Sequence, residues 1–180
     1  MRKKPDQNGS PNLDGLNKQE EDNLSLKIYP DSVLREVCDP VERFDSELSD
    51  LLDAMLRLMR ANNGIGLAGP QVGITRRLFV CEIQGRSLCL VNPKILEGDG
   101  KADLVEGCLS LPDVQVDVTR NREIQLTAYD PSGRQKQLKA SALWARVIQH
   151  EIDHLDGVLI CDHGEPVNSP SAAEPDIENE

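Results

Sequence analysis

The sequence predicts an α+β fold with a largely antiparallel sheet. Three observations lead to this prediction: an apolar stripe at helical spacing over residues 48–59, a second one over residues 143–155, and strand-like segments between them that are joined by short turns. A helix, several strands and a second helix, in that order, are typical of the α+β class. The chain has 180 residues, which is the length of one ordinary domain.

The first helix is predicted from leucine and methionine side chains that recur every three or four residues. They lie at i, i+3, i+4, i+7, i+8 and i+11, and they are Leu48, Leu51, Leu52, Met55, Leu56 and Met59. Asp45 or Ser46 can cap the start of this helix, and Asn62-Asn63-Gly64 can end it.

Two β-hairpins are predicted after this helix. In each of them two strand-like segments flank a short turn: 77–83 and 87–91 around Gln84-Gly85-Arg86, and 123–129 and 135–140 around Pro131-Ser132-Gly133. The second helix is predicted to start near Ser141 and to stop at Gly157. Its apolar positions are Leu143, Val147, Ile148, Ile152 and Leu155.

The two ends of the chain differ in composition from the middle. Residues 1–23 are polar and show no periodicity, and residues 164–180 carry five acidic residues, three prolines and no base. We expect both to be disordered, the first as an extension and the second as an acidic tail, with one folded domain over residues 24–163.

Charge and cysteine content narrow the class of function. The chain has 20 basic and 31 acidic residues, a formal net charge of −11, which argues against direct binding to nucleic acid. It has no run of 18 apolar residues and no secretory signal, so we expect neither a membrane span nor export. Its five cysteines are odd in number and widely spaced, as is usual in the reducing cytoplasm.

The second helix carries a metal-binding motif, QHEIDH at residues 149–154. His150 and His154 are one helical turn apart, so both rings can reach one cation. Glu151 lies about 100° further round the helix, where it can accept a proton from a water bound to that cation. Imidazole ligands suit Zn²⁺, Fe²⁺ or Ni²⁺.

A catalytic site of this kind needs a third protein ligand. The metzincin pattern would place a histidine at Ile160, and His163 comes three residues too late. The gluzincin pattern would use a distant acid such as Glu174, which lies in the proline-rich tail. Cys108 is the better candidate because thiolates bind such metals strongly, although a buried structural cysteine is the open alternative. We expect the other four cysteines to be structural.

Residues 64–69, GIGLAG, match the G-x-G-x-x-G pattern of dinucleotide-binding proteins. That pattern requires a strand before it and a helix after it, whereas here a helix precedes it and Pro70 follows it. We therefore interpret the segment as backbone with little side-chain bulk, which a ligand can approach closely. Gln71 follows it, either as an amide donor to that ligand or as an ordinary surface residue.

Taken together, GIGLAGPQVG at 64–73, EGCLS at 106–110 and QHEIDHLDG at 149–157 resemble the three signature blocks of peptide deformylases, and YPDSVLREVCDPV at 29–41 resembles their N-terminal segment. The resemblance implies antiparallel sheets packed around a central helix that carries the metal motif. It implies one Fe²⁺ per chain, or Ni²⁺, Co²⁺ or Zn²⁺ in its place, with these ligands: Cys108, His150 and His154. It implies these catalytic residues: Glu151 as general base, and Gln71 and the backbone N–H of Leu109 as oxyanion donors.

The activity that the resemblance implies is removal of the formyl group from the formyl-methionine that begins a newly made polypeptide. Residues that can form the methionine pocket are Leu104, Val105, Leu143 and Val147, and Ile65 and Gly66 can pair with the peptide backbone. Nascent N-formyl-methionyl peptides, and through them transient proximity to the ribosome, are the expected partners. The alternatives are a general HExxH metalloprotease with another third ligand, and a metal-binding module, for which Glu151 would have no use.

Two residues depart from the family pattern. Gly69 stands where the family usually has alanine, and Gln115 stands where some members carry an arginine. The tail is acidic, so a ribosome-binding role of basic C-terminal extensions does not carry over to this chain.

Overall fold

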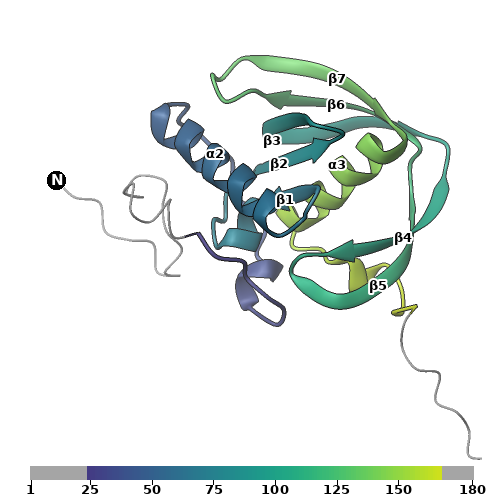
Figure 1. Ribbon diagram of the computed structural model, residues 1–180. Coiled ribbons are helices and arrows are strands. Elements are labelled where there is room, and N and C mark those ends of the chain that lie inside the picture. The colour runs from purple at the N-terminus through teal and green to yellow at the C-terminus, as the bar shows by residue number, and fades with distance from the viewer. Residues whose placement is uncertain (1–23, 168–180) are drawn as a thin grey trace, which may run out of the picture.

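The computed structural model describes residues 24–167 (Figure 1). A five-stranded sheet has the order β1-β2-β3-β6-β7, and a two-stranded ribbon is formed by β4 and β5. The strands are β1 (Gly66–Ala68), β2 (Leu78–Ile83), β3 (Arg86–Asp99), β4 (Ala102–Cys108), β5 (Leu111–Arg120), β6 (Glu123–Tyr129) and β7 (Gln135–Ser141). The helices are α2 (Ser46–Ala61) and α3 (Ala142–Leu155), with 3₁₀ turns η2 (Ser32–Arg35), η3 (Gly69–Val72) and η4 (Ile160–Asp162).

Every pairing between these strands is antiparallel, which confirms the predicted fold class. Both predicted hairpins form, as β2–β3 and β6–β7. The strand predicted over 87–91 is longer, because β3 continues to Asp99 and pairs there with β6. The sequence analysis missed the β4–β5 ribbon altogether, although alternate residues of β5 are buried at Val116, Val118 and Arg120.

Strand β2 is buried on both faces, and this places the two helices. Phe79 and Cys81 pack in a cluster with residues of α3, whereas Leu78 and Val80 pack in a cluster with residues of α2. Successive side chains of a strand point to opposite faces, so α2 and α3 cover opposite faces of the large sheet. 

Helix α2 begins and ends where its sequence indicates. The side chain of Asp45 caps it by accepting a hydrogen bond from the N–H of Leu48 at 3.1 Å. Asn62 is its C-cap, and Asn63 has a positive φ of 56°. The apolar stripe predicted from the sequence is the buried face of this helix.

Helix α3 lies between the large sheet and the β4–β5 ribbon (Figure 1). Its residue Gln149 is hydrogen-bonded to the backbone of Asn121, which follows β5. The Oε1 of Gln149 accepts from the N–H of Asn121 at 3.1 Å, and its Nε2 donates to the carbonyl of Asn121 at 2.9 Å. Gly157 follows the helix with a φ of +74°, a left-handed conformation that glycine adopts without strain. The helix is therefore central to the fold, as the resemblance implied.

The ends of the described region pack near the β4–β5 ribbon. The N–H of Lys27 donates to the carbonyl of Gln71, and the N–H of Tyr29 donates to that of Ser110. Pro166 bridges to Val116 of β5. The N–H of Val167 also donates to the carbonyl of Gln115, so two residues that the sequence analysis assigns to the tail pair with β5. The remainder of that tail, 168–180, and the extension 1–23 lie outside the described residues.

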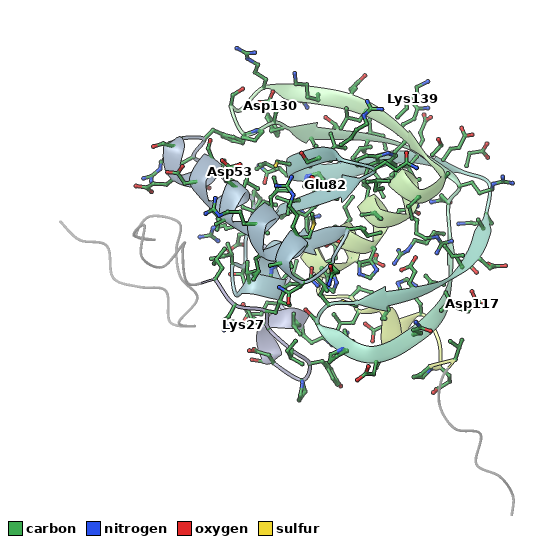
Figure 2. All side chains as sticks on the ribbon, in the orientation of Figure 1. Lys27, Asp53, Glu82, Asp117, Asp130 and Lys139 are labelled. Atoms are coloured by element: carbon green, nitrogen blue, oxygen red, sulfur yellow. The ribbon has the colours of Figure 1, made fainter. Side chains whose placement is uncertain are left out.

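Charged side chains such as Asp53, Asp117 and Lys139 lie on the outside of the molecule (Figure 2). No helix in residues 24–167 is long and apolar enough to cross a membrane.

Candidate active site

The structure brings Cys108 together with His150 and His154. One ligand atom from each of these residues lies within 4.8 Å of the other two. The Sγ of Cys108 is 3.3 Å from the Nε2 of His154. Helix α3 supplies both histidines, and Cys108 is the last residue of β4, where the pairing with β5 shifts register. The three residues that the sequence analysis assigns to the metal therefore form one cluster.

The chemistry of this cluster fits a divalent metal. A thiolate and two imidazoles are a ligand set that borderline-soft ions such as Zn²⁺ and Fe²⁺ accept. The Nδ1 of His150 lies 2.9 Å from the Oε2 of Glu106, so this hydrogen bond fixes the ring and leaves its other nitrogen for a metal. Three protein ligands leave a coordination position for water or substrate, as catalytic sites require.

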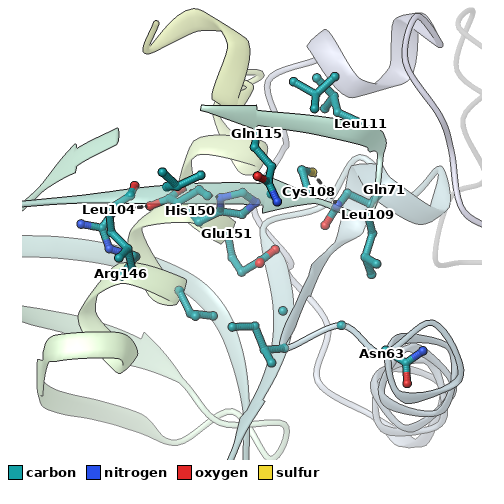
Figure 3. A pocket seen from close by; sticks show the side chains of 18 of the residues that line it. Asn63, Gln71, Leu104, Cys108, Leu109, Leu111, Gln115, Arg146, His150 and Glu151 are labelled. Atoms are coloured by element: carbon teal, nitrogen blue, oxygen red, sulfur yellow. Dashed lines mark hydrogen bonds and ion pairs between the residues drawn. The ribbon is translucent and has the colours of Figure 1, made fainter. Parts of the chain in front are cut away.

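Glu151 is buried beside this cluster with one unpaired oxygen (Figure 3). Its Oε2 has no hydrogen-bond partner among the described residues. Burial raises the pKa of this carboxyl to about 7, although the charges of His150 and Arg120 oppose the rise. A carboxylate with a pKa near neutrality, aimed into a cavity, is suited to accept and return a proton.

Gly66 makes room for Glu151. A Cβ atom at position 66 would lie 2.0 Å from the Oε1 of Glu151, far closer than two such atoms can approach. The low side-chain bulk expected from the GIGLAG segment therefore leaves space for Glu151 as well as for a ligand.

Gln71 is a buried residue of η3, which excludes the surface alternative. Its Oε1 accepts a hydrogen bond from the N–H of Ala68 at 2.8 Å, and this bond orients the amide. Its Nε2 then points to the Oγ of Ser110 at 3.2 Å and to the Sγ of Cys108 at 3.5 Å. Leu109 lies between Cys108 and Ser110 in the sequence, and it lines the same cavity as Gln71. The two predicted oxyanion donors are thus neighbours of the metal cluster.

Glu106 is the centre of a buried ionic network that the sequence analysis missed. Arg120 donates to both of its oxygens at 2.7 and 2.9 Å, and Arg146 donates to its Oε1 at 2.6 Å. Burial raises the pKa of this carboxyl, but hydrogen bonds from His150 and Arg120 outweigh burial and lower it to about 2. The sequence did contain a signal for this network. Arg146 lies among the apolar positions of its helix, and an arginine that is buried there needs an acidic partner.

A cavity of about 570 Å³ opens next to these groups. All residues predicted for substrate binding line it: Ile65, Gly66, Leu104, Val105, Leu143 and Val147. Leu104, Ile65 and Leu143 are 52%, 47% and 43% exposed, so they form an apolar mouth. Among the strands of residues 24–167, β1 pairs only with β2 and is the edge of its sheet, which leaves it able to pair with an extended peptide.

The residues considered for the two protease patterns do not join the cluster. His163 pairs instead with the Oδ2 of Asp153 at 2.8 Å, and Ile160 is a buried core residue. Glu174 lies outside the described residues. Among the other cysteines, Cys38 is buried, and burial raises the pKa of its thiol to about 12, as expected of a structural residue.

Comparison with known proteins agrees with this geometry. A family model described as polypeptide deformylase matches residues 23–169. The peptide deformylase of Dictyoglomus turgidum is 44% identical over 139 residues, which are 77% of this chain and 91% of that protein. The peptide deformylase of Caldicellulosiruptor bescii is 45% identical over 137 residues, 76% of this chain and 82% of that one.

Solved structures give the same result. The crystal structure of peptide deformylase from Thermotoga maritima superposes with a TM-score of 0.77 at 38% identity, and the match covers 79% of this chain and 98% of that one. A peptide deformylase from Synechococcus elongatus in complex with actinonin has a TM-score of 0.78 at 42% identity. The match covers 81% of this chain and 80% of that one. The chain belongs to the polypeptide deformylase family.

Proposed function

We propose that Glu151, Gln71 and Leu109 carry out catalysis beside a metal ion held by Cys108, His150 and His154. The enzyme removes the N-formyl group from the formyl-methionine at the start of new polypeptides and releases formate. The observation that carries the assignment of roles is the buried, unpaired Oε2 of Glu151 next to the Cys-His-His cluster. An acid in that position has a use in hydrolysis and none in metal storage.

The family is metal-dependent, and the Cys-His-His cluster suits a divalent ion. When bound, such an ion polarises the formyl carbonyl and lowers the pKa of a bound water. We propose Fe²⁺ as the ion, one per chain, with Ni²⁺, Co²⁺ or Zn²⁺ able to replace it. A thiolate and two neutral imidazoles would leave the site with a net charge near +1, enough to polarise a carbonyl.

Glu151 moves the proton in this scheme. Its unpaired oxygen accepts the proton of the attacking water as the water oxygen bonds to the formyl carbon, and then returns it to the leaving nitrogen as the C–N bond breaks. The formyl oxygen gains negative charge between these steps. The Nε2 of Gln71 and the N–H of Leu109 would donate to it, and one such donor is typically worth about 2.7–4 kcal/mol in the transition state.

The cavity would hold the peptide by its backbone and by its first side chain. The backbone would add to the edge of β1 at Ile65 and Gly66 as an extra antiparallel or parallel strand. The methionine side chain would enter the apolar part of the cavity, lined by Leu104, Val105, Leu143 and Val147. We place the enzyme in the cytoplasm and in transient proximity to the ribosome, because its substrates are newly made polypeptides.

Formate release tests this function. Formyl-Met-Ala peptides should release formate, formyl-Gly-Ala should respond much more weakly, and internal bonds of casein should stay intact. Burying a methionine side chain is worth about 1.5–3 kcal/mol, so a difference of ten- to a hundredfold in kcat/KM is expected between the two peptides. Metal-dependent cleavage of casein without formate release would instead favour the general metalloprotease.

A further inference from the structure

Arg146 lines the substrate cavity together with the apolar residues Leu104, Leu143 and Val147, while polar residues such as Gln115 line other parts of the cavity. The side chain of Arg146 is 8% exposed. It lies beside Leu104, at the end of the pocket away from Gln71 and Leu109 (Figure 3). Since Gln71 and Leu109 mark the place of the formyl group, Arg146 marks the far end of the space that the first side chain enters.

Four acceptors hold the guanidinium of Arg146 in place. Its Nη1 donates to the Oε1 of Glu106 at 2.6 Å and to the carbonyl of Val118 at 2.8 Å, with the carbonyl of Leu104 at 3.5 Å. Its Nη2 donates to the carbonyl of Ala102 at 2.6 Å. Helix α3 is thereby linked to both β4 and β5, and the guanidinium plane is fixed.

These bonds do not use all the donors of the guanidinium. An arginine has five N–H groups, one on Nε and two on each Nη. The hydrogen on Nε and the second hydrogen on Nη2 take part in none of the bonds above. A rigid cation with two N–H groups outside these bonds therefore adjoins the apolar residues Leu104, Leu143 and Val147 of the cavity.

We propose that Arg146 is a specificity-determining residue that lets the enzyme deformylate N-formyl-methionine sulfoxide peptides as well as N-formyl-methionine peptides. The sulfoxide has the length of methionine but ends in a strong hydrogen-bond acceptor, whereas a thioether sulfur is a weak one. Burying the sulfoxide oxygen in a purely apolar pocket without a hydrogen bond would weaken binding, and a donor from Arg146 removes that cost. This inference rests on the proposed function and on the peptide orientation given above.

The chemical step is unchanged. One water adds to the formyl carbon, the C–N bond breaks, and formate and a free amine leave. The sulfoxide oxygen stays on the sulfur, so no oxidant or reductant is required.

The test compares three peptides on three forms of the metal-loaded enzyme. The peptides are formyl-methionine sulfoxide-Ala, formyl-norleucine-Ala and formyl-Met-Ala, and norleucine serves as the side chain of similar length without an acceptor. The measured quantity is the ratio of kcat/KM for the sulfoxide to kcat/KM for norleucine, from formate release. A ratio cancels any general loss of activity or metal that a variant suffers.

The variants are Arg146→Met and, as the matched control, Arg120→Met. Both arginines are buried and both donate to Glu106, but Arg120 does not line the cavity. We expect Arg146→Met to lower the sulfoxide ratio at least tenfold and Arg120→Met to leave it within twofold, whatever either does to the overall rate. Arg146→Lys should also lower the ratio, because a single ammonium that pairs with Glu106 cannot span both groups; it replaces Arg146→Met if that variant does not fold.

Each result decides one question. An unchanged ratio in Arg146→Met, or an equal fall in Arg120→Met, would overturn the proposal. So would a wild-type enzyme that cleaves formyl-Met-Ala but processes the sulfoxide peptide less than a hundredth as well as norleucine. If the wild type released no formate from formyl-Met-Ala, the proposed function itself would fail, and that outcome is distinct from the others.

Discussion

Glu151 occupies space that any side chain at position 66 would fill. Its Oε1 would lie 2.0 Å from a Cβ on Gly66, and its Oε2 is buried without a hydrogen-bond partner among the described residues. The glycine thus leaves room for Glu151, the proposed general base, in addition to lying where we propose that a peptide pairs. At the scale of single residues, the site therefore requires that position 66 has no side chain, in addition to the three predicted metal ligands.

Replacement of Gly66 by alanine should displace Glu151 without removing the metal. We expect Gly66→Ala to lower kcat for formyl-Met-Ala at least tenfold, because the proton acceptor moves, while metal content stays near one ion per chain. Gly164→Ala is the control, since its Cβ would make an ordinary 3.5 Å contact with Val116. Full activity of Gly66→Ala would show that the position of Glu151 is not critical.

Mutation of a proposed metal ligand and mutation of the proposed general base should have different effects on metal content. Cys108→Ala should lose both metal and activity, because one of three protein ligands is gone. Glu151→Gln should keep the metal and lose about 10²–10⁴-fold in kcat, the usual contribution of a general base. Metal analysis alongside formate release distinguishes the two, and a Cys108→Ala variant that held metal as tightly as the parent would refute the ligand set.

At the scale of secondary-structure elements, Glu106 joins three of them. It lies on β4, Arg120 lies on β5, and Arg146 and His150 lie on α3. All of these side chains except His150 are at least nine-tenths buried. A carboxylate with this many donors is stabilised in its charged form, so the ribbon and the helix are held together by a group whose protonation weakens the fold.

Acid should therefore remove the contribution of Glu106. Its folded-state pKa of about 2 is below the ordinary value of 4.5, so the charged carboxylate stabilises the fold above pH 4.5, and this stability is lost as the pH falls towards 2. The shift corresponds to about 3 kcal/mol at neutral pH.

The measurement is the free energy of unfolding of the parent and of Glu106→Gln, in urea, between pH 7 and pH 2. Metal is removed first with a chelator, so that its release by acid does not contribute. The difference between the two proteins should be largest above pH 4.5 and should shrink below it. A difference that stays constant with pH would contradict the role given to this carboxylate.

At the scale of the whole molecule, the large sheet separates two cores. The core under α2 contains none of Cys108, His150 and His154, although Leu109 packs against it, whereas the core under α3 surrounds the helix that carries both histidines. The stability of the α2 side and the geometry of the site should therefore be separable.

Met55→Ala tests that separation. Met55 is fully buried in α2, so this change should destabilise the protein by about 2–5 kcal/mol. Metal content and kcat of the folded protein should stay within about twofold of the parent, as measured below the denaturation midpoint. Asp53→Ala, at an exposed position of the same helix, should change stability by less than about 0.5 kcal/mol. A loss of metal in Met55→Ala would mean that the two cores are coupled.

The sequence by itself determined what depends on local spacing. The stripe from Leu48 to Met59 and the cap at Asp45 predict α2, because both rest on contacts within a few residues. His150, Glu151 and His154 are placed by the geometry of one helix, so their mutual arrangement needs no knowledge of the fold. The three family motifs added the third ligand and the two oxyanion donors as an expectation.

Only the tertiary structure decided how distant segments meet. Cys108 is 46 residues from His154, and Glu106 is 40 residues from Arg146. Their contacts require the β4–β5 pairing, its register shift after Gly107, and the packing of that ribbon on α3. Spacing along the chain cannot specify such contacts, because the loops between them can close in many ways at similar entropic cost. Packing of buried surfaces selects one arrangement, and that arrangement placed Arg146 at the end of the pocket.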